Sequence, residues 1–206
     1  MPASLEGFRP NDAMRAEVAA FMGEREPEPE HVTQVCALAL SLFDQLQERH
    51  RLDEGARFLL ESGALLHDIG WSEAPDGRKH HKLAYQMIRS HAWESVPAEA
   101  VAVIALIARY HRRAMPDASH EGFADLALAD RELVNGLAAI LRVADALDRS
   151  HQARVNGIGV HDRGDTMEIR LRTPYPCGAE LDAAESKKDL FEEAFRTSLS
   201  FVLEGR

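Results

Sequence analysis

The chain has few cysteines: Cys36 and Cys177 are the two among 206 residues. Two cysteines cannot build the disulfide framework that stabilises small secreted domains. We therefore expect a reduced interior and a fold that depends on its hydrophobic core, for which this length is sufficient. Cys36 is expected to be a small core residue rather than a nucleophile.

Long apolar runs are also missing. No stretch approaches the roughly 18 consecutive apolar residues that suggest a membrane span, and the first residues lack the basic start and apolar run of a secretion signal. Positive charge is scarce, because 24 Lys and Arg face 34 Asp and Glu, which gives a net charge of -10. Since nucleic-acid binders are more often basic, we expect a cytoplasmic protein that binds neither membrane nor nucleic acid.

Most of the sequence is predicted to be helical, because apolar residues recur at helical spacing. Asn11 and Asp53 stand where they can cap helices that run to about Met22 and Gly70. Another stripe carries His31, Val35 and Leu42 on one face. Further helices are expected over 80–91, 96–111 and from about 130 to 150, with loops over 71–79 and 112–128. The first loop holds an Asp-Gly turn signal at 76–77.

The pattern changes after residue 151. The segment VNGIGVHDRGDTMEIRLR has two apolar-alternating runs around a polar turn, which predicts a β-hairpin. A helix is predicted over 182–197, and SFVLE at 200–204 can add a last strand. The predicted fold class is therefore mainly α: a helical bundle over residues 1–152, with a small C-terminal α+β appendage over residues 153–206 packed on it.

Several ionisable residues interrupt the apolar faces of separate predicted helices. They are His31, His67 with its neighbour Asp68, His111 and Asp145. Burying such groups is unfavourable unless they find partners. Imidazole and carboxylate together suit a divalent metal such as Mn, Mg, Fe, Ni, Co or Zn, held by side chains that project inward from facing helices. The alternative is that each is an ordinary core or helix-end residue, satisfied by the backbone.

Basic residues lie close in sequence to these groups. They are Arg78, Lys79, Lys82, Arg112, Arg113, Arg142 and Arg149. Arg and Lys bind phosphate groups, so this cluster indicates a phosphorylated ligand. The alternative is a solvated surface with ion pairs such as Asp145 with Arg149. His50, His91, His120, His151 and His161 are expected to be ordinary surface residues, and Trp71 and Trp93 are expected to pack under loops.

The order of the candidate ligands resembles a known superfamily. An isolated helical His31, the dipeptide His67-Asp68 and a distant Asp145 resemble the HD-domain metal-dependent phosphohydrolases. The segments RKHHKLAYQMIRSH, VIALIARYHRRAMP and LAAILRVADALDRSH narrow the likeness. They are similar to the C-terminal helical domain of exopolyphosphatase and guanosine-pentaphosphate phosphatase proteins, and the likeness covers about residues 31–204.

The resemblance implies a set of site residues for one or two divalent ions. The implied metal ligands are His31, His67, Asp68, His80, His111 and Asp145, with His81 as the alternative to His80. Asp68 would bridge two ions or accept a proton from water, and Asp68 and His67 would be the catalytic pair. Arg112, Arg113 and Lys82 would bind phosphate.

The implied function is a metal-dependent phosphohydrolase that cleaves a phosphoester or phosphoanhydride of a nucleotide-like or polyphosphate substrate. One departure from the family matters, because full-length exopolyphosphatases carry ATPase-like catalytic domains ahead of this one. This sequence has none of their Gly-rich phosphate loops. The alternatives are a non-catalytic module that binds polyphosphate or nucleotides, and a dimerisation domain that would make a homodimer.

Overall fold

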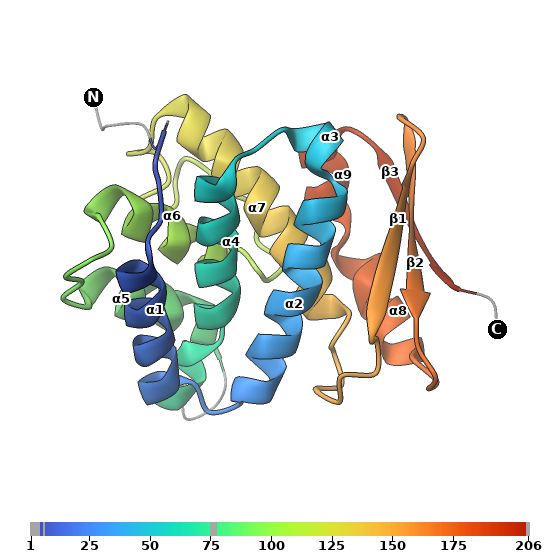
Figure 1. The fold of residues 1–206 in the computed structure, drawn as a ribbon, viewed down its shortest axis with the longest axis horizontal. Helices are drawn as coiled ribbons and strands as arrows, with labels where there is room; N and C mark the ends of the chain where they lie inside the picture. The colour runs from blue at the N-terminus through green and yellow to red at the C-terminus, as the bar shows by residue number, and fades with distance from the viewer. Residues whose placement is uncertain (1–4, 6, 75–77, 205–206) are drawn as a thin grey trace.

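The structure is a computed structural model that describes residues 5, 7–74 and 78–204, and it is mainly helical with one small sheet (Figure 1). The first part contains α1 (Asp12–Arg25), α2 (Pro29–Gln45), α3 (Gln47–His50), α4 (Glu54–Leu66), the short 3-10 helix η1 (Ile69–Glu73), α5 (His80–Ser90), α6 (Ala98–Arg109) and α7 (Leu128–Ala146). The second part contains β1 (Gly157–Asp162), β2 (Thr166–Arg172), α8 (Gly178–Lys187), α9 (Asp189–Phe195) and β3 (Ser198–Leu203). The predicted fold class is confirmed.

Two helices begin where the sequence predicts. The side chain of Asn11 accepts a hydrogen bond from the backbone N–H of Met14, and Asp53 does the same for Ala56, so each satisfies an otherwise unpaired donor. The helix after Asp53 ends at Leu66, earlier than the predicted end near Gly70. Gly70 instead lies in η1, pressed against the backbone of α5, where a side chain would not fit. The predicted Asp-Gly turn lies outside the described residues.

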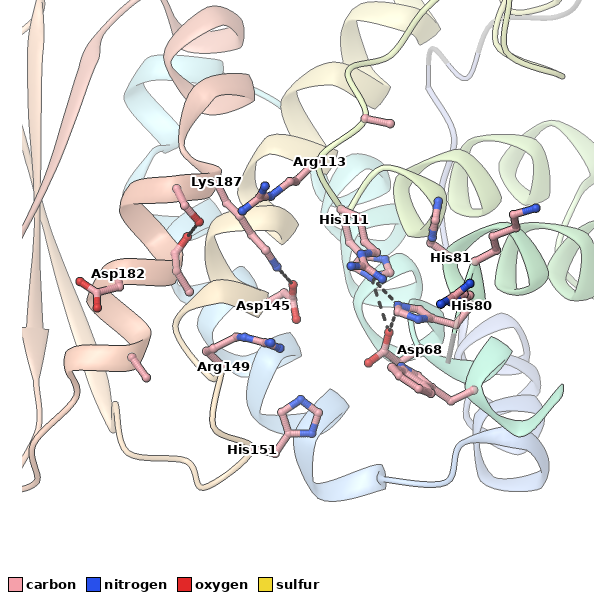
Figure 2. Close-up of a pocket in the computed structure, with 18 residues that line it drawn as sticks. Asp68, His80, His81, His111, Arg113, Asp145, Arg149, His151, Asp182 and Lys187 are labelled. Atoms are coloured by element: carbon pink, nitrogen blue, oxygen red, sulfur yellow. Dashed lines mark hydrogen bonds and ion pairs between the residues drawn. The ribbon is translucent and has the colours of Figure 1, made fainter. Parts of the chain in front are cut away.

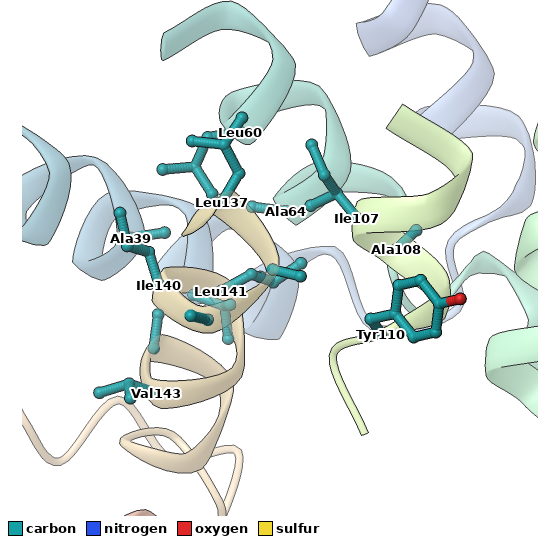
Figure 3. Close-up of a cluster of buried hydrophobic side chains, with 14 of the residues drawn as sticks. Ala39, Leu60, Ala64, Ile107, Ala108, Tyr110, Leu137, Ile140, Leu141 and Val143 are labelled. Carbon is teal, nitrogen blue, oxygen red and sulfur yellow. The ribbon is translucent and has the colours of Figure 1, made fainter. Parts of the chain in front are cut away.

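The core forms where α7 packs against α2, α4 and α6. Figure 3 shows side chains from these four helices meeting, with Ala39 on α2, Ala64 on α4 and Leu141 on α7. All three are fully buried, and the small alanines let the helices approach closely. The predicted stripe on α2 is confirmed, because Val35 and Leu42 are buried beside His31. The last helix of this part ends at Ala146, short of the predicted 150.

The sheet has the order β1-β2-β3. The predicted hairpin is confirmed: β1 pairs antiparallel with β2, and β3 then pairs parallel with β2 after a helical crossover. That crossover is two helices, α8 and α9, rather than the single helix predicted over 182–197. Asp189 begins the second helix, where its carboxylate accepts hydrogen bonds from its own neighbour Leu190 and from the buried Arg142 of α7.

The C-terminal part contacts the helical part along two helices. Figure 1 shows the sheet at one end of the molecule, and α8 and α9 contact both α7 and β3. The side chain of Gln45 on α2 pairs with the backbone of β1, donating to Ile158 O and accepting from Val160 N. The division into residues 1–152 and 153–206 stays a prediction. Within the described residues, we find no helix with the length and apolar character needed to cross a membrane.

Candidate metal centre

The ends of five helices meet at one place and bring the six predicted ligands together. The helices α2 and α5 begin at this place, and α4, α6 and α7 end at it. His31 lies in the first turn of α2, His67 and Asp68 follow the end of α4, His80 opens α5, His111 follows α6, and Asp145 lies in the last turn of α7. Five of the six residues are buried, and Asp145 is nearly so. Their ligand atoms form two groups.

The first group is His31, His67 and Asp145. The Nε2 atoms of His31 and His67 lie 3.7 and 3.8 Å from Oδ1 of Asp145. These distances exceed a hydrogen bond, so the three atoms face a shared point without bonding to one another. Both Nε2 atoms are buried and have no hydrogen-bond partner in the described part of the chain. An unpartnered buried nitrogen is costly, and a divalent cation would supply the missing partner.

The second group is Asp68, His80 and His111. The Nε2 atoms of the two histidines are 3.3 Å apart, and they lie 3.4 and 3.6 Å from Oδ1 of Asp68 (Figure 2). The ring of Trp71 stacks on His80 with a centroid distance of 4.4 Å. The geometry therefore places His80 in the group, while His81 lies beside it on the cavity wall.

Asp68 joins the two groups. Its Oδ1 faces His80 and His111, and its Oδ2 lies 3.8 Å from His31 Nε2 and 3.7 Å from His67 Nε2. One carboxylate thus presents an oxygen to each group. This is the arrangement that a carboxylate takes when it bridges a pair of ions.

The other ring nitrogens are held by the protein. Nδ1 of His31 lies 2.8 Å from Oδ2 of Asp148, and Nδ1 of His67 and His111 lie 2.7 and 2.6 Å from the carbonyls of Ala64 and Ala108. Those carbonyls belong to the last turns of α4 and α6, where helices leave backbone acceptors unpaired. Fixing Nδ1 in this way turns Nε2 of each ring toward the centre, as is usual for histidines that bind metals.

The charged side chains of the centre shift one another's pKa values. Burial would lower the pKa of His31, but the carboxylates of Asp145 and Asp148 raise it to about 10. Burial would raise the pKa of Asp145, but the ammonium of Lys187 and the ring of His31 hold it well below its usual range. Without a cation, the protonated ring of His31 therefore balances the carboxylates. A divalent ion would have to displace that proton.

A cavity of about 1050 Å³ opens beside the two groups (Figure 2). Its lining includes Asp68, His80, His111 and Asp145 from the centre. Its cationic lining consists of Arg78, Lys79, Arg112, Arg113, Arg149 and Lys187. In a chain with a net charge of -10, this concentration of positive charge favours an anionic ligand.

The predicted phosphate-binding residues divide into two sets. Arg112 and Arg113 line the cavity, but Lys82 is exposed and does not line it. Arg142, from the same basic cluster, is fully buried and holds backbone carbonyls and Asp189 instead. The alternative ion pair of Asp145 with Arg149 is not what forms, because Asp145 pairs with Lys187.

Sequence reasoning missed four neighbours of the centre. Asp148 and Lys187 were not singled out, although the spacing of Asp148, three residues after Asp145, places both on one helical face. His151 is at the surface as expected, yet its ring stacks on that of His31 with a centroid distance of 3.7 Å. Its Nδ1 lies 2.6 Å from Oε2 of Glu28. Trp71 does not pack under a loop, because it is 43% exposed.

The comparisons with known proteins identify the family. A search of curated proteins finds no match. A family model described as Ppx/GppA phosphatase, domain III, matches residues 17–190. The matched range contains all six residues of the two groups and most of the C-terminal part. The chain therefore belongs to the Ppx/GppA phosphatase domain III family.

Proposed function

We propose that the protein is an HD-type metal-dependent phosphohydrolase that cleaves a phosphoester or phosphoanhydride of a nucleotide-like or polyphosphate substrate. The observation that carries the proposal is the pair of His/Asp groups joined by the two oxygens of Asp68. The chain's membership of a phosphatase family supports it. The unpartnered Nε2 atoms of His31 and His67 support a cation at this place.

His31, His67, Asp68 and Asp145 would hold one divalent ion, and His80 and His111 would join Asp68 around a second. Such ions supply a water of lowered pKa and a positive centre for phosphoryl oxygens. Asp68 would offer one carboxylate oxygen to each position, and its carboxylate would also serve as the group that accepts a proton from water. Asp148 and the carbonyls of Ala64 and Ala108 keep the rings oriented.

The walls of the cavity bind the substrate in this proposal. Arg112 and Arg113 follow His111 directly in sequence, so the end of α6 carries both a candidate ligand and two guanidinium groups to the same cavity. A guanidinium binds a phosphoryl group through paired hydrogen bonds. These side chains would orient the phosphoryl group and stabilise the charge that develops on its oxygens.

A second candidate is a module that binds polyphosphate or nucleotides without turnover. The observation behind it is that the matching family is a single domain of a phosphatase, domain III. In that case the centre would hold a metal and an anion but release no phosphate. A pure dimerisation role is less well supported, since it gives no reason to orient six ligand residues toward shared points.

Metal analysis and a substrate screen test the proposal. Purified protein is analysed for bound metals, then assayed for phosphate release from nucleotides and polyphosphate with added Mn²⁺ or Mg²⁺. Bound metal with phosphate release from at least one substrate supports the enzyme. Bound metal with no release from any substrate supports the binding module, and absence of metal binding contradicts both.

Removing the bridging carboxylate is the sharpest mutational test. We expect Asp68→Ala to lose bound metal and to lower any hydrolysis more than about a hundredfold, since both groups lose a ligand. Asp125→Ala, at an exposed position in the loop before α7, serves as the matched control and should behave as wild type. Metal content and phosphate release measure both outcomes. Activity that survives Asp68→Ala would show that the centre is assigned wrongly.

A further inference from the structure

Lys187 enters the candidate centre from the C-terminal part of the chain. It is the last residue of α8, and its Nζ donates to Oδ2 of Asp145 at 2.5 Å. Figure 2 shows the side chain reaching toward Asp145, and both side chains are largely buried, with 17% and 13% of their surfaces exposed. Asp145 turns its other oxygen, Oδ1, to His31 and His67. One carboxylate therefore faces both the first ligand group and an ammonium.

This placement is costly for a site that only binds metal. An ammonium beside a ligand carboxylate repels a divalent cation at short range, and partial burial strengthens the repulsion. An ammonium also has three donors, and within the described residues Asp145 is the one hydrogen-bonding partner of Lys187. The remaining donors belong to a side chain that lines the cavity with Arg113 and Arg149. An anionic ligand would use them.

The fold holds Lys187 in this position. The fully buried guanidinium of Arg142 on α7 donates to Oδ1 of Asp189 at 2.6 Å, two residues after Lys187. The same guanidinium donates to the carbonyl of Ala114, in the segment after His111. Arg142 thus ties the junction of α8 and α9 to both sides of the centre. The neighbouring Lys188 turns the other way, to Glu185 and the carbonyl of Leu199 on β3.

We propose that Lys187 is an anion-binding residue that α8 inserts into the centre, where it is paired with Asp145 until a phosphoryl group arrives. The inference rests on the proposed function, because it needs a metal in the centre and a phosphate-bearing ligand. It adds that the C-terminal part supplies a wall of the site. It also predicts that Lys187 weakens the binding of the metal ion and strengthens the binding of phosphate.

The test measures both affinities in neutral variants. Lys187→Met and Lys187→Gln are compared with wild type, and Lys188→Met is the matched control. Mn²⁺ binding to metal-free protein, and then inorganic phosphate binding to the manganese-loaded protein, are measured by titration calorimetry at constant salt. Circular dichroism checks that each variant is folded.

We expect both Lys187 variants to bind Mn²⁺ about threefold to tenfold more tightly, because a nearby like charge is gone. We expect them to bind phosphate about tenfold more weakly, because a charge-assisted hydrogen bond is lost. Lys188→Met should change neither affinity. If the Lys187→Met variant does not fold, the two affinities of Lys187→Gln alone test the proposal.

Other outcomes overturn the proposal. If both affinities weaken together, Lys187 has a structural role or positions Asp145. If Mn²⁺ binding tightens and phosphate binding is unchanged, Lys187 is only a counter-ion for Asp145. Failure of the proposed function gives a different result. If the Lys187 variants bind Mn²⁺ more tightly and phosphate more weakly, but the wild-type protein releases phosphate from no substrate, the role of Lys187 is upheld and catalysis is refuted. Wild-type protein that binds no Mn²⁺ refutes both.

Discussion

Asp148 shows how a single side chain outside the two groups controls the centre. Its Oδ2 accepts from Nδ1 of His31, and its Oδ1 accepts from the backbone N–H of Ala153 at 2.8 Å. The residue is 1% exposed, so both bonds are shielded from water. When a cation displaces one proton from the ring, Asp148 keeps the remaining proton on Nδ1, and Nε2 faces the ligand group.

We expect Asp148→Asn to lower metal affinity about tenfold to a hundredfold. The amide oxygen can keep the bond to Ala153, which leaves the amide NH₂ facing His31. Nδ1 must then accept, and the ring proton moves to Nε2, where it blocks a cation. Titration calorimetry with Mn²⁺ measures the change, and unaltered affinity would contradict the role given to Asp148.

His50 gives a pH dependence that is independent of the centre. Burial lowers the pKa of His50; its Nε2 pairs with the carbonyl of Phe43, and its Nδ1 accepts from the N–H of Leu52. The folded protein thus favours the neutral ring. A lowered folded-state pKa contributes stability above the unfolded value, about 6.5, and this stability is lost as the pH falls through the folded value.

We therefore expect the free energy of unfolding to decrease between pH 7.5 and pH 5.5, and to decrease less in His50→Gln. Urea unfolding of metal-free protein at the two pH values measures the difference. An equal decrease in wild type and variant would show that His50 stays neutral or is exposed enough to charge freely.

Some residues of the site could be predicted from the sequence and others could not. His31, His67, His111 and Asp145 were predictable because each interrupts an apolar helical face, and burial of an ionisable group demands a partner. Lys187 was not predictable, since it lies among the charged residues at the end of a short helix, where Lys is ordinarily solvated. Its role depends on how α8 docks on α7, which no local pattern encodes.

At the scale of elements, the contact between η1 and α5 sets the second ligand group. Gly70 lies so close to α5 that a Cβ would stand 2.1 Å from the carbonyl oxygen of His80 and 2.7 Å from the backbone nitrogen of Ala84. Backbone atoms cannot give way as a flexible side chain can. The position therefore requires glycine for its small size.

We expect Gly70→Ala to destabilise the fold by about 1–3 kcal/mol through overpacking and to weaken metal binding by moving His80. Gly136→Ala on α7 is the matched control: apart from the neighbouring backbone of its own helix, no atom of the described residues lies within 4 Å of the added Cβ, so it should stabilise the helix by about 0.5–1 kcal/mol. Urea unfolding and Mn²⁺ titration measure both. A Gly70→Ala variant as stable as wild type would show that η1 can move away from α5.

Element boundaries were predicted best where a cap is local. Asn11 and Asp53 mark their helices because the capping bond spans three residues of the chain. The end of α4 and the break between α8 and α9 were wrong in the prediction, because tertiary contacts decide them. Gly70 is held by α5, and Asp189 is held by Arg142 of α7.

At the scale of the whole molecule, the two parts share buried surface. The fully buried Ala184 of α8 and Phe191 of α9 belong to the same core cluster as Leu141 of α7, and the family match extends across both parts. The C-terminal part thus packs on the helical part through a shared core, and the division at residues 152 and 153 stays a prediction. We expect the two parts to unfold together.

The two free cysteines can show whether the two parts unfold together, because buried Cys36 lies on α2 and buried Cys177 lies just before α8. We expect both thiols to become reactive at the same urea concentration in a pulsed labelling experiment, because a shared core makes unfolding cooperative. Mass spectrometry of the labelled peptides gives each midpoint. Labelling of Cys177 at a lower concentration than Cys36 would show that the C-terminal part unfolds by itself.

The parallel pairing of β2 with β3 has a consequence for biosynthesis. A hairpin can close as soon as its second strand leaves the ribosome, whereas a parallel partner must wait for the crossover between them. Lys187 lies within that crossover. All the histidines of the two ligand groups are therefore synthesised, and can pack with neighbouring helices, before β3 pairs with β2 and completes the wall that carries Lys187.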